Sequence, residues 1–192
     1  APRAAIGMDC AVGPERSAIA GLWFLEALKI PAAVADVMTA HLGNGVHLYE
    51  HGVISFSNQL AKDCGVREGM PVKEAALLLL TIDTANMSSA ETTNRTIMQT
   101  SSDGRHVVAT DSIAFATEED SERNVLVTAG HTGRSAVPYL LESKPWGFIC
   151  SDGGRGMDDS GIAGLTIVEE FGLAGATVDA KLARMGSGLS HY

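Results

Sequence analysis

Short apolar runs alternate with amphipathic stretches along the chain, and most of the apolar runs end at a glycine or an acidic residue. Such runs are typical of buried strands. The sequence therefore predicts strands over residues 3–8, 32–38, 107–115, 124–128, 146–150 and 176–182. It predicts helices over 54–64, 72–81 and 135–142, and two more that begin near Ser17 and Ser160 and end near Ile30 and Gly172. Strands and helices that alternate in this way favour an α/β fold, a largely parallel sheet with flanking helices.

An internal repeat is the most informative pattern. Residues 8–49 resemble residues 151–192 at a constant offset of 143, which aligns Asp9 with Asp152. The two stretches share far more residues than the roughly three matches expected by chance between chains of this composition. We therefore predict that the fold is built from a duplicated strand–loop–helix–strand core.

The repeat divides the chain into three parts. Residues 1–85 are expected to hold the first core and a helical tail, and residues 106–192 a preceding segment, the head, and the second core. Residues 86–105, rich in serine and threonine, read as a polar linker or crossover. The first core has a tail but no head, and the second has a head but no tail. This order predicts a homo-oligomer that exchanges segments between subunits.

Composition narrows the class of function. The formal charge of −9 and a pI near 5.0 argue against nucleic acid as a partner, and 5% aromatic residues leave little surface for base stacking. The apolar runs are too short to cross a membrane. Three widely spaced cysteines and an N-terminal stretch unlike a secretory signal predict a reducing, cytoplasmic location without disulfides.

The loop between the strand at 124–128 and the next helix, Thr128-Ala-Gly-His-Thr-Gly-Arg-Ser135, is the first candidate site. Its glycines free the backbone, and the amide groups at a helix N-terminus attract anions. His131 is the candidate proton-transfer residue, and Thr132, Gly133 and Ser135 are candidate ligands of the substrate. A glycine-containing turn with a surface histidine is the alternative.

The loop after the strand at 146–150 is the second candidate site. Asp152 is expected to orient a histidine, act as a base or hold a metal, and Gly153 and Arg155 to bind an anion. In the alternative, Asp152 only closes a turn with its own backbone. Arg184 aligns with His41 in the repeat, and both are expected to face an anion or the equivalent loop of a partner subunit.

Other chemistry has weaker support. The chain lacks the phosphate-binding patterns GxxxxGKS and GxGxxG and the GxSxG nucleophile elbow. Cys150 is expected to be a buried strand residue, with a nucleophilic thiolate as the alternative. The three histidines His41, His47 and His51 match no zinc spacing, so we predict no metal and no cofactor; a metal-dependent enzyme that uses them with Asp9 is the least favoured reading.

The segment 62–80 carries a helix, a GVxxGM turn and a second helix containing KEAALLL. With the strand that ends at Cys150 and the turn after it, this segment resembles the small bacterial YunC-like proteins. The resemblance implies a small α/β oligomer and transfers no catalytic residue.

Two functions follow from these features. The first is an enzyme, a hydrolase or lyase, that acts on a small anionic molecule bearing a carboxylate or phosphate. His131 and Asp152 would perform acid/base catalysis there, and Arg155 and Arg184 would bind the anion. The second is a non-enzymatic protein, in which the same loops bind a small ligand or close an oligomer.

Overall fold

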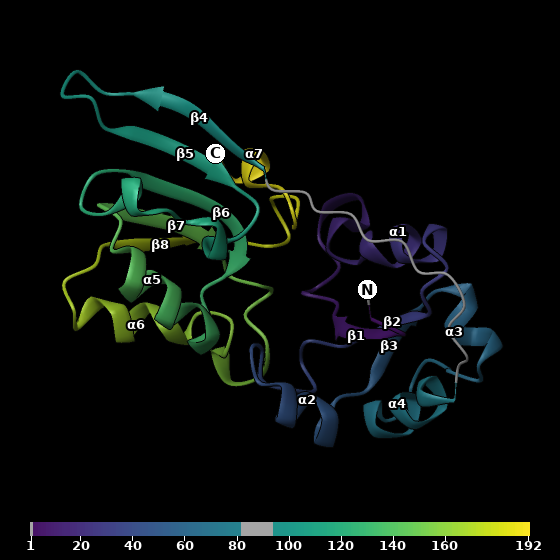
Figure 1. Ribbon diagram of the computed structural model, residues 1–192. Coiled ribbons are helices and arrows are strands. Elements are labelled where there is room, and N and C mark those ends of the chain that lie inside the picture. The colour runs from purple at the N-terminus through teal and green to yellow at the C-terminus, as the bar shows by residue number, and fades with distance from the viewer. Residues whose placement is uncertain (1, 82–93) are drawn as a thin grey trace.

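The computed structural model describes residues 2–81 and 94–192, which form two lobes that lie side by side (Figure 1). Each lobe has its own sheet, with strand order β1-β2-β3 in the first and β4-β5-β6-β7-β8 in the second. The strands are β1 (Ala5–Met8), β2 (Ala32–Ala35), β3 (Ile54–Ser57), β4 (Arg95–Thr100), β5 (His106–Thr110), β6 (Val125–His131), β7 (Gly147–Ser151) and β8 (Gly175–Val178). The fold is therefore mixed α/β.

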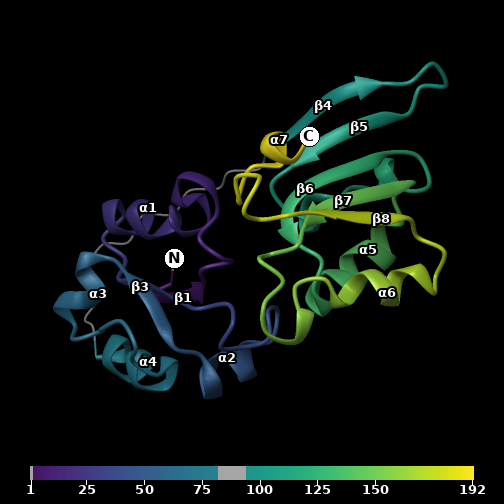
Figure 2. The ribbon, with the colours of Figure 1, turned by 180° about the vertical axis from the view of Figure 1, so that it is seen from behind.

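Helices flank both sheets. The α-helices are α1 (Gly21–Ala27), α2 (Gly45–His51), α3 (Gln59–Asp63), α4 (Val72–Leu80), α5 (Val137–Ser143), α6 (Ala163–Glu169) and α7 (Gly188–His191). Single turns of 3-10 helix are η1 (Pro14–Ile19), η2 (Ile113–Phe115), η3 (Glu118–Asp120), η4 (Arg134–Ala136) and η5 (Met157–Asp159). Helices α5 and α6 lie together on one face of the second sheet, and α2 lies where the lobes approach each other (Figure 2).

Strand direction agrees with the sequence in most of the second sheet. Strands β5, β6, β7 and β8 are parallel, and β4 is antiparallel to β5. In the first sheet β1 and β2 are parallel, and β3 is antiparallel to β2. Parallel strands place their carboxyl ends at one edge of a sheet, and the loops after β1, β6 and β7 leave from those edges.

Each lobe has its own hydrophobic core. In the first lobe, Ala33 and Ile54 of the sheet pack with Val66, Val72 and Leu79 of the tail. In the second lobe, side chains of the sheet pack against α5 and α6; they include Leu126, Leu140, Phe148, Cys150 and Val168. In α4 the buried residues Val72, Ala75 and Leu79 recur at spacings of three and four, which is the period of an amphipathic helix.

Two predicted elements are wrong. Residues 54–64 were expected to form one helix, but they form the strand β3 followed by the short helix α3. Ile54 is buried while Ser55 and Ser57 are only partly covered, and pairing with β2 selects the strand. The predicted polar linker at 86–105 is also wrong from residue 95 on, because β4 and a hairpin turn occupy that stretch; residues 86–93 lie outside the described residues.

Some boundaries also differ. The predicted strands at 32–38, 107–115 and 176–182 end at residues 35, 110 and 178. The two helices predicted to end near Ile30 and Gly172 end at Ala27 and Glu169. In the described ranges 2–81 and 94–192, no helix is long and apolar enough to span a bilayer.

Candidate functional site: the junction of the two lobes

The loop after β1 is organised by Asp9, a buried carboxylate at the end of the strand. Its Oδ1 accepts the amide N–H of Ala11 at 3.2 Å and that of Val37 at 3.1 Å. Its Oδ2 accepts the hydroxyl of Ser55 at 2.9 Å. The carboxylate thus ties the loop to the end of β2 and to β3.

The loop after β7 is organised by Asp152 in the same way. The Oδ1 of this buried carboxylate accepts the N–H of Gly154 at 2.8 Å and that of Ala180 at 2.9 Å. Asp152, Gly154 and Ala180 follow Asp9, Ala11 and Val37 by 143 positions each. Asp152 therefore closes a turn with the backbone, which is the structural alternative that the sequence left open.

The two loops also share an uncommon backbone course. Positive φ angles are costly for residues other than glycine, so a matching run of them is informative. They recur at the six pairs of positions 10/153, 11/154, 12/155, 13/156, 15/158 and 16/159. The paired residues Ala11 and Gly154 meet at the junction: a Cβ on Gly154 would lie 2.6 Å from the Cβ of Ala11. Glycine is required at that point of close approach.

Contacts between the lobes are reciprocal. The hydroxyl of Ser17 accepts the N–H of Met185 at 3.1 Å, and the hydroxyl of Ser160 accepts the N–H of Leu42 at 2.9 Å. These serines were expected in the first turn of their helices. Each instead lies in or beside a 3-10 turn before the helix, and its hydroxyl binds the other lobe.

Two ion pairs cross the junction at matching positions. The guanidinium of Arg184 lies 2.6 Å from the carboxylate of Glu15, and Nε2 of His41 lies 2.8 Å from Oδ2 of Asp158. The sequence predicted that His41 and Arg184 face either an anion or the equivalent loop of a partner subunit. In the structure both face a carboxylate of the opposite lobe within the same chain.

His131 supports the junction from inside the second lobe. Its Nδ1 accepts the N–H of Gly133 at 2.9 Å, so the neutral ring carries its proton on Nε2. Burial lowers the pKa of His131 below the ordinary value of 6.5. A Cβ on Gly43 of the first lobe would lie 3.3 Å from Cε1 of His131 and 2.5 Å from the hydroxyl of Ser135.

The structure brings only some of the predicted site residues together. His131, Gly133 and Gly153 are close: a Cβ on Gly133 or Gly153 would lie within 2.9 Å of the His131 side chain. Within residues 2–81 and 94–192, however, no hydrogen bond joins His131 to Asp152. Thr132 is fully buried, and its hydroxyl has no hydrogen-bond partner in the described part of the chain.

The predicted anion-binding arginines are already paired. Arg155 donates from Nε to Oδ1 of Asp159 at 2.8 Å on an exposed surface. This hydrogen bond raises the pKa of Arg155 and lowers the pKa of Asp159. Arg184 pairs with Glu15 as described above. In each arginine a carboxylate already neutralises the charge that was expected to bind a substrate.

A pocket of about 690 Å³ opens at the junction. Its lining comes from both lobes and comprises His41, Leu42, Gly43, Asn44, Gly45, Val46, Arg134, Asp158, Ser160 and Ala163. Arg134 is exposed and forms no ion pair with any residue that the structure describes. The pocket therefore combines an available guanidinium with a histidine held by a carboxylate.

Sequence reasoning did not pair His41 with Asp158, which lie 117 residues apart. A signal was present in the repeat. His41 aligns with Arg184 and Asp158 aligns with Glu15, so a cation and an anion each occur at matching positions of residues 8–49 and 151–192. The pattern predicts two pairs if these two stretches face each other.

Cys10 and Cys150 are unsuited to nucleophilic chemistry. Burial, together with the charges of Asp9 and Asp152, raises the pKa of the Cys10 thiol to about 12. Burial also raises the pKa of the Cys150 thiol, despite the hydroxyls of Thr128 and Thr132 beside it. Thiolates are the reactive form, and neither group supplies one near neutral pH.

The rings of the three histidines at 41, 47 and 51 lie next to one another, with His41 stacked on His47 and His51 tilted against His47. The rings of His41 and His47 lie 4.1 Å apart, and those of His47 and His51 lie 4.4 Å apart. Desolvation and the neighbouring imidazoles lower the pKa of His47. No group of three or more candidate metal ligands occurs in the part of the chain that the structure describes.

Comparison with known proteins gives no match: no family model fits the chain, and neither a curated protein nor a solved structure is similar to it. The geometry of the junction therefore carries the functional argument.

Proposed function

We propose that the protein is an enzyme, of hydrolase or lyase type, that acts on a small anionic molecule in the junction pocket. One observation carries this proposal: the pocket holds the His41–Asp158 pair together with Arg134, a cation without a carboxylate partner among the described residues. A guanidinium offers paired donors that suit a carboxylate or phosphate. A histidine beside it can exchange a proton with the bound molecule.

His41 is the proton-transfer group in this proposal, in place of His131. Nε2 of His41 donates to Oδ2 of Asp158, which fixes the ring and leaves Nδ1 for proton exchange. The carboxylate stabilises the imidazolium that forms when His41 removes a proton. His131, by contrast, uses Nδ1 to hold its own loop, so it is a positioning residue.

The duplication of the core belongs to the same proposal. We infer that residues 8–49 and 151–192 descend from one ancestral unit, since hydrogen bonds, left-handed residues and ion pairs recur at the offset of 143. In this view the two copies diverged. The His41–Asp158 pair lies in the pocket and takes part in the reaction, whereas the Arg184–Glu15 pair only joins the two lobes.

A thermal-shift screen tests the binding step. Inorganic phosphate and simple dicarboxylates such as malonate are added to the wild type, to Arg134→Ala and to Lys62→Ala. A ligand at one hundred times its Kd stabilises a protein by about 2.7 kcal/mol. We expect one anion to raise the Tm of the wild type and of Lys62→Ala but not of Arg134→Ala. Lys62 is an exposed residue of α3 and controls for the lost charge. An equal shift in all three proteins contradicts the proposal.

Turnover separates an enzyme from a binding protein. Esters and hydroxy acids that carry the preferred anion are incubated with wild type and with His41→Gln, and products are followed by NMR. We expect the variant to bind but not to turn over any compound.

The alternative function, a non-enzymatic binding or assembly protein, is favoured by the many exposed apolar side chains of both lobes, such as Phe171 and Leu182. Binding without turnover by the wild type supports that alternative.

A further inference from the structure

Strands β2 and β8 occupy matching places in their sheets but have different neighbours. β1 pairs with β2 through Ala5 and Ala32, and β7 pairs with β8 through Phe148 and Gly175, which is the same register at the offset of 143. In the first sheet β2 lies between β1 and β3, whereas β8 is the edge strand of the second sheet. In the part of the chain that the structure describes, no strand covers the free side of β8 as β3 covers β2.

Asn58 follows β3 directly and hydrogen-bonds the backbone of β2 on the side that faces β3. Its N–H donates to the carbonyl of Ala32 at 2.9 Å, and its Oδ1 accepts the N–H of Ala32 at 3.0 Å. Its Nδ2 donates to the carbonyls of Ile30 at 2.9 Å and Leu22 at 3.3 Å. Its Oδ1 also caps α3 by accepting the N–H of Ala61. One buried side chain thus joins β2, the end of α1 and α3.

Two further contacts attach the same segment. The N–H of Gln59 donates to Oε2 of Glu26 at 2.7 Å, and the hydroxyl of Ser55 donates to Oδ2 of Asp9 at 2.9 Å. The segment 54–63 therefore contacts the first core at the strand edge, at the end of α1 and at the loop carboxylate.

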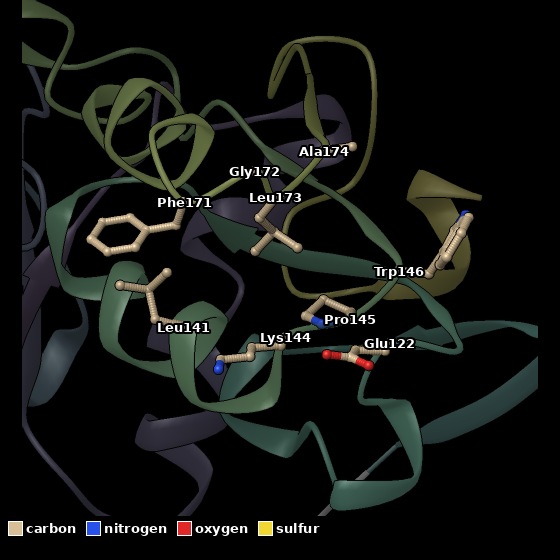
Figure 3. A pocket seen from close by; sticks show the side chains of 9 residues that line it. All are labelled: Glu122, Leu141, Lys144, Pro145, Trp146, Phe171, Gly172, Leu173 and Ala174. Atoms are coloured by element: carbon tan, nitrogen blue, oxygen red, sulfur yellow. The ribbon is translucent and has the colours of Figure 1, made fainter.

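The second core presents the same groups, and no segment within residues 2–81 and 94–192 covers them as 54–63 covers the first core. Ile30 and Ala32 are 2% and 1% exposed, but Leu173 is only half-buried and Gly175 is exposed. Glu169 corresponds to Glu26 and is also exposed. An open pocket of about 930 Å³ adjoins this edge, in which Phe171 stands over Leu141 at one end and Trp146 stands at the other (Figure 3). The remaining lining residues are Glu122, Lys144, Pro145, Gly172, Leu173 and Ala174.

We propose that the open edge of β8, with Glu169 and the adjoining pocket, is a docking surface for a protein segment of the same kind as residues 54–63, carried by a partner protein. The segment adds a strand antiparallel to β8, as β3 does to β2. Its asparagine hydrogen-bonds the backbone of Gly175 and Leu173. The helix that follows donates its first amide to Glu169.

A synthetic peptide of residues 50–69 tests the proposal. Binding is measured by titration calorimetry, and protection of β8 by hydrogen–deuterium exchange of the full chain. We expect the peptide to slow exchange at residues 175–178. A peptide with Asn58→Ala is expected to bind about tenfold more weakly, because it leaves backbone groups unpaired and loses a helix cap. The protein variant Glu169→Ala is expected to weaken binding about threefold, and its neighbour Glu170→Ala is the matched control without effect.

A fusion protein provides a second test in case the free peptide is too unfolded to bind. Residues 50–81 are appended after Tyr192, which places them in the register that they have after Tyr49. Protection of β8 in the fusion, lost on changing the appended asparagine to alanine, supports the proposal. It is overturned if neither peptide nor fusion protects β8, if protection changes only at β2, or if a second copy of the chain already protects β8 in the absence of peptide.

Discussion

Strands β2 and β8 have the short, similar sequences AAVA and GATV and the same register against their neighbours, yet they differ in burial. All four residues of β2 are buried, whereas the first two residues of β8 are exposed. The difference comes from the segment that packs on the strand. The burial of β2 is thus decided by β3 and by Asn58, which lies 26 residues from Ala32 in the sequence.

At the junction, by contrast, matching positions make the same contacts although their residue types differ. Arg184–Glu15 and His41–Asp158 fill matching positions with different cations and different acids. Backbone hydrogen bonds to Asp9 and Asp152 are the same on both sides. The junction therefore requires a given geometry and a given sign of charge at each position. It does not require a given residue type, so a histidine can stand on one side and an arginine on the other.

The largest expected effect concerns the second lobe. Asp120 is fully buried, and both its carboxylate oxygens accept hydrogen bonds from Arg95, at 2.9 and 3.0 Å. We expect Arg95→Met to lower the free energy of unfolding by about 3–5 kcal/mol, because it leaves a buried charge unpaired. Urea denaturation measures the loss.

Arg105→Met is the matched control. Arg105 pairs with Asp103 on the surface, where an ion pair contributes about 1 kcal/mol or less. Equal losses in the two variants would show that burial of Asp120 does not set the stability of this lobe.

The corresponding test of the first lobe is Asn58→Ala. The change leaves the N–H of Ala32 and the carbonyl of Ile30 without their partner in a buried site. We expect the free energy of unfolding to fall by about 2–4 kcal/mol, measured by urea denaturation.

Asn44→Ala is the control for the loss of a cap, since Asn44 caps α2 through a single bond to the N–H of His47 in an exposed site. That variant is expected to lose about 1 kcal/mol. A loss in Asn58→Ala no larger than in Asn44→Ala would contradict the role given to Asn58.

These residues also show how far the sequence predicts the structure. Apolar runs predicted β1, β7 and α4, because local periodicity is enough for a buried strand or an amphipathic helix. β3 was mistaken for a helix, since its strand form depends on pairing with β2. In the candidate site, the loop after β7 was expected from strand and glycine patterns, but residues 128–131, which were expected in a loop, form the end of β6. The His41–Asp158 pair joins residues 117 apart, and only the alignment of the two copies could indicate it.

A smaller effect is expected from pH. Burial of Asp120 opposes ionisation, but the hydrogen bonds from Arg95, Thr117 and Asn124 outweigh it, so the pKa of Asp120 lies below its ordinary value. The unfolded chain then binds more protons at low pH, and stability is lost as pH falls below about 4. Urea midpoints between about pH 2.5 and 6 measure this loss. Asp120→Asn is expected to flatten the profile, and an unchanged profile would assign the acid sensitivity to other carboxylates.

The smallest expected effects lie in the two ion pairs of the junction, and a double-mutant cycle on each isolates them. One cycle combines Arg184→Ala with Glu15→Ala, and the other combines His41→Ala with Asp158→Ala. Glu15 and Asp158 both have positive φ angles, but the strain of alanine there appears on both sides of a cycle and cancels. The four side chains are between 35% and 78% exposed, so we expect a coupling of about 0.2–1 kcal/mol in each cycle, measured by urea denaturation.

A cycle without coupling would separate the two sides of the junction. Absence of coupling between His41 and Asp158 would mean that the carboxylate does not hold the imidazole, and it would contradict the role of Asp158 in the proposed proton transfer. Absence of coupling between Arg184 and Glu15 alone would leave that role intact and would show that the second pair does not join the lobes.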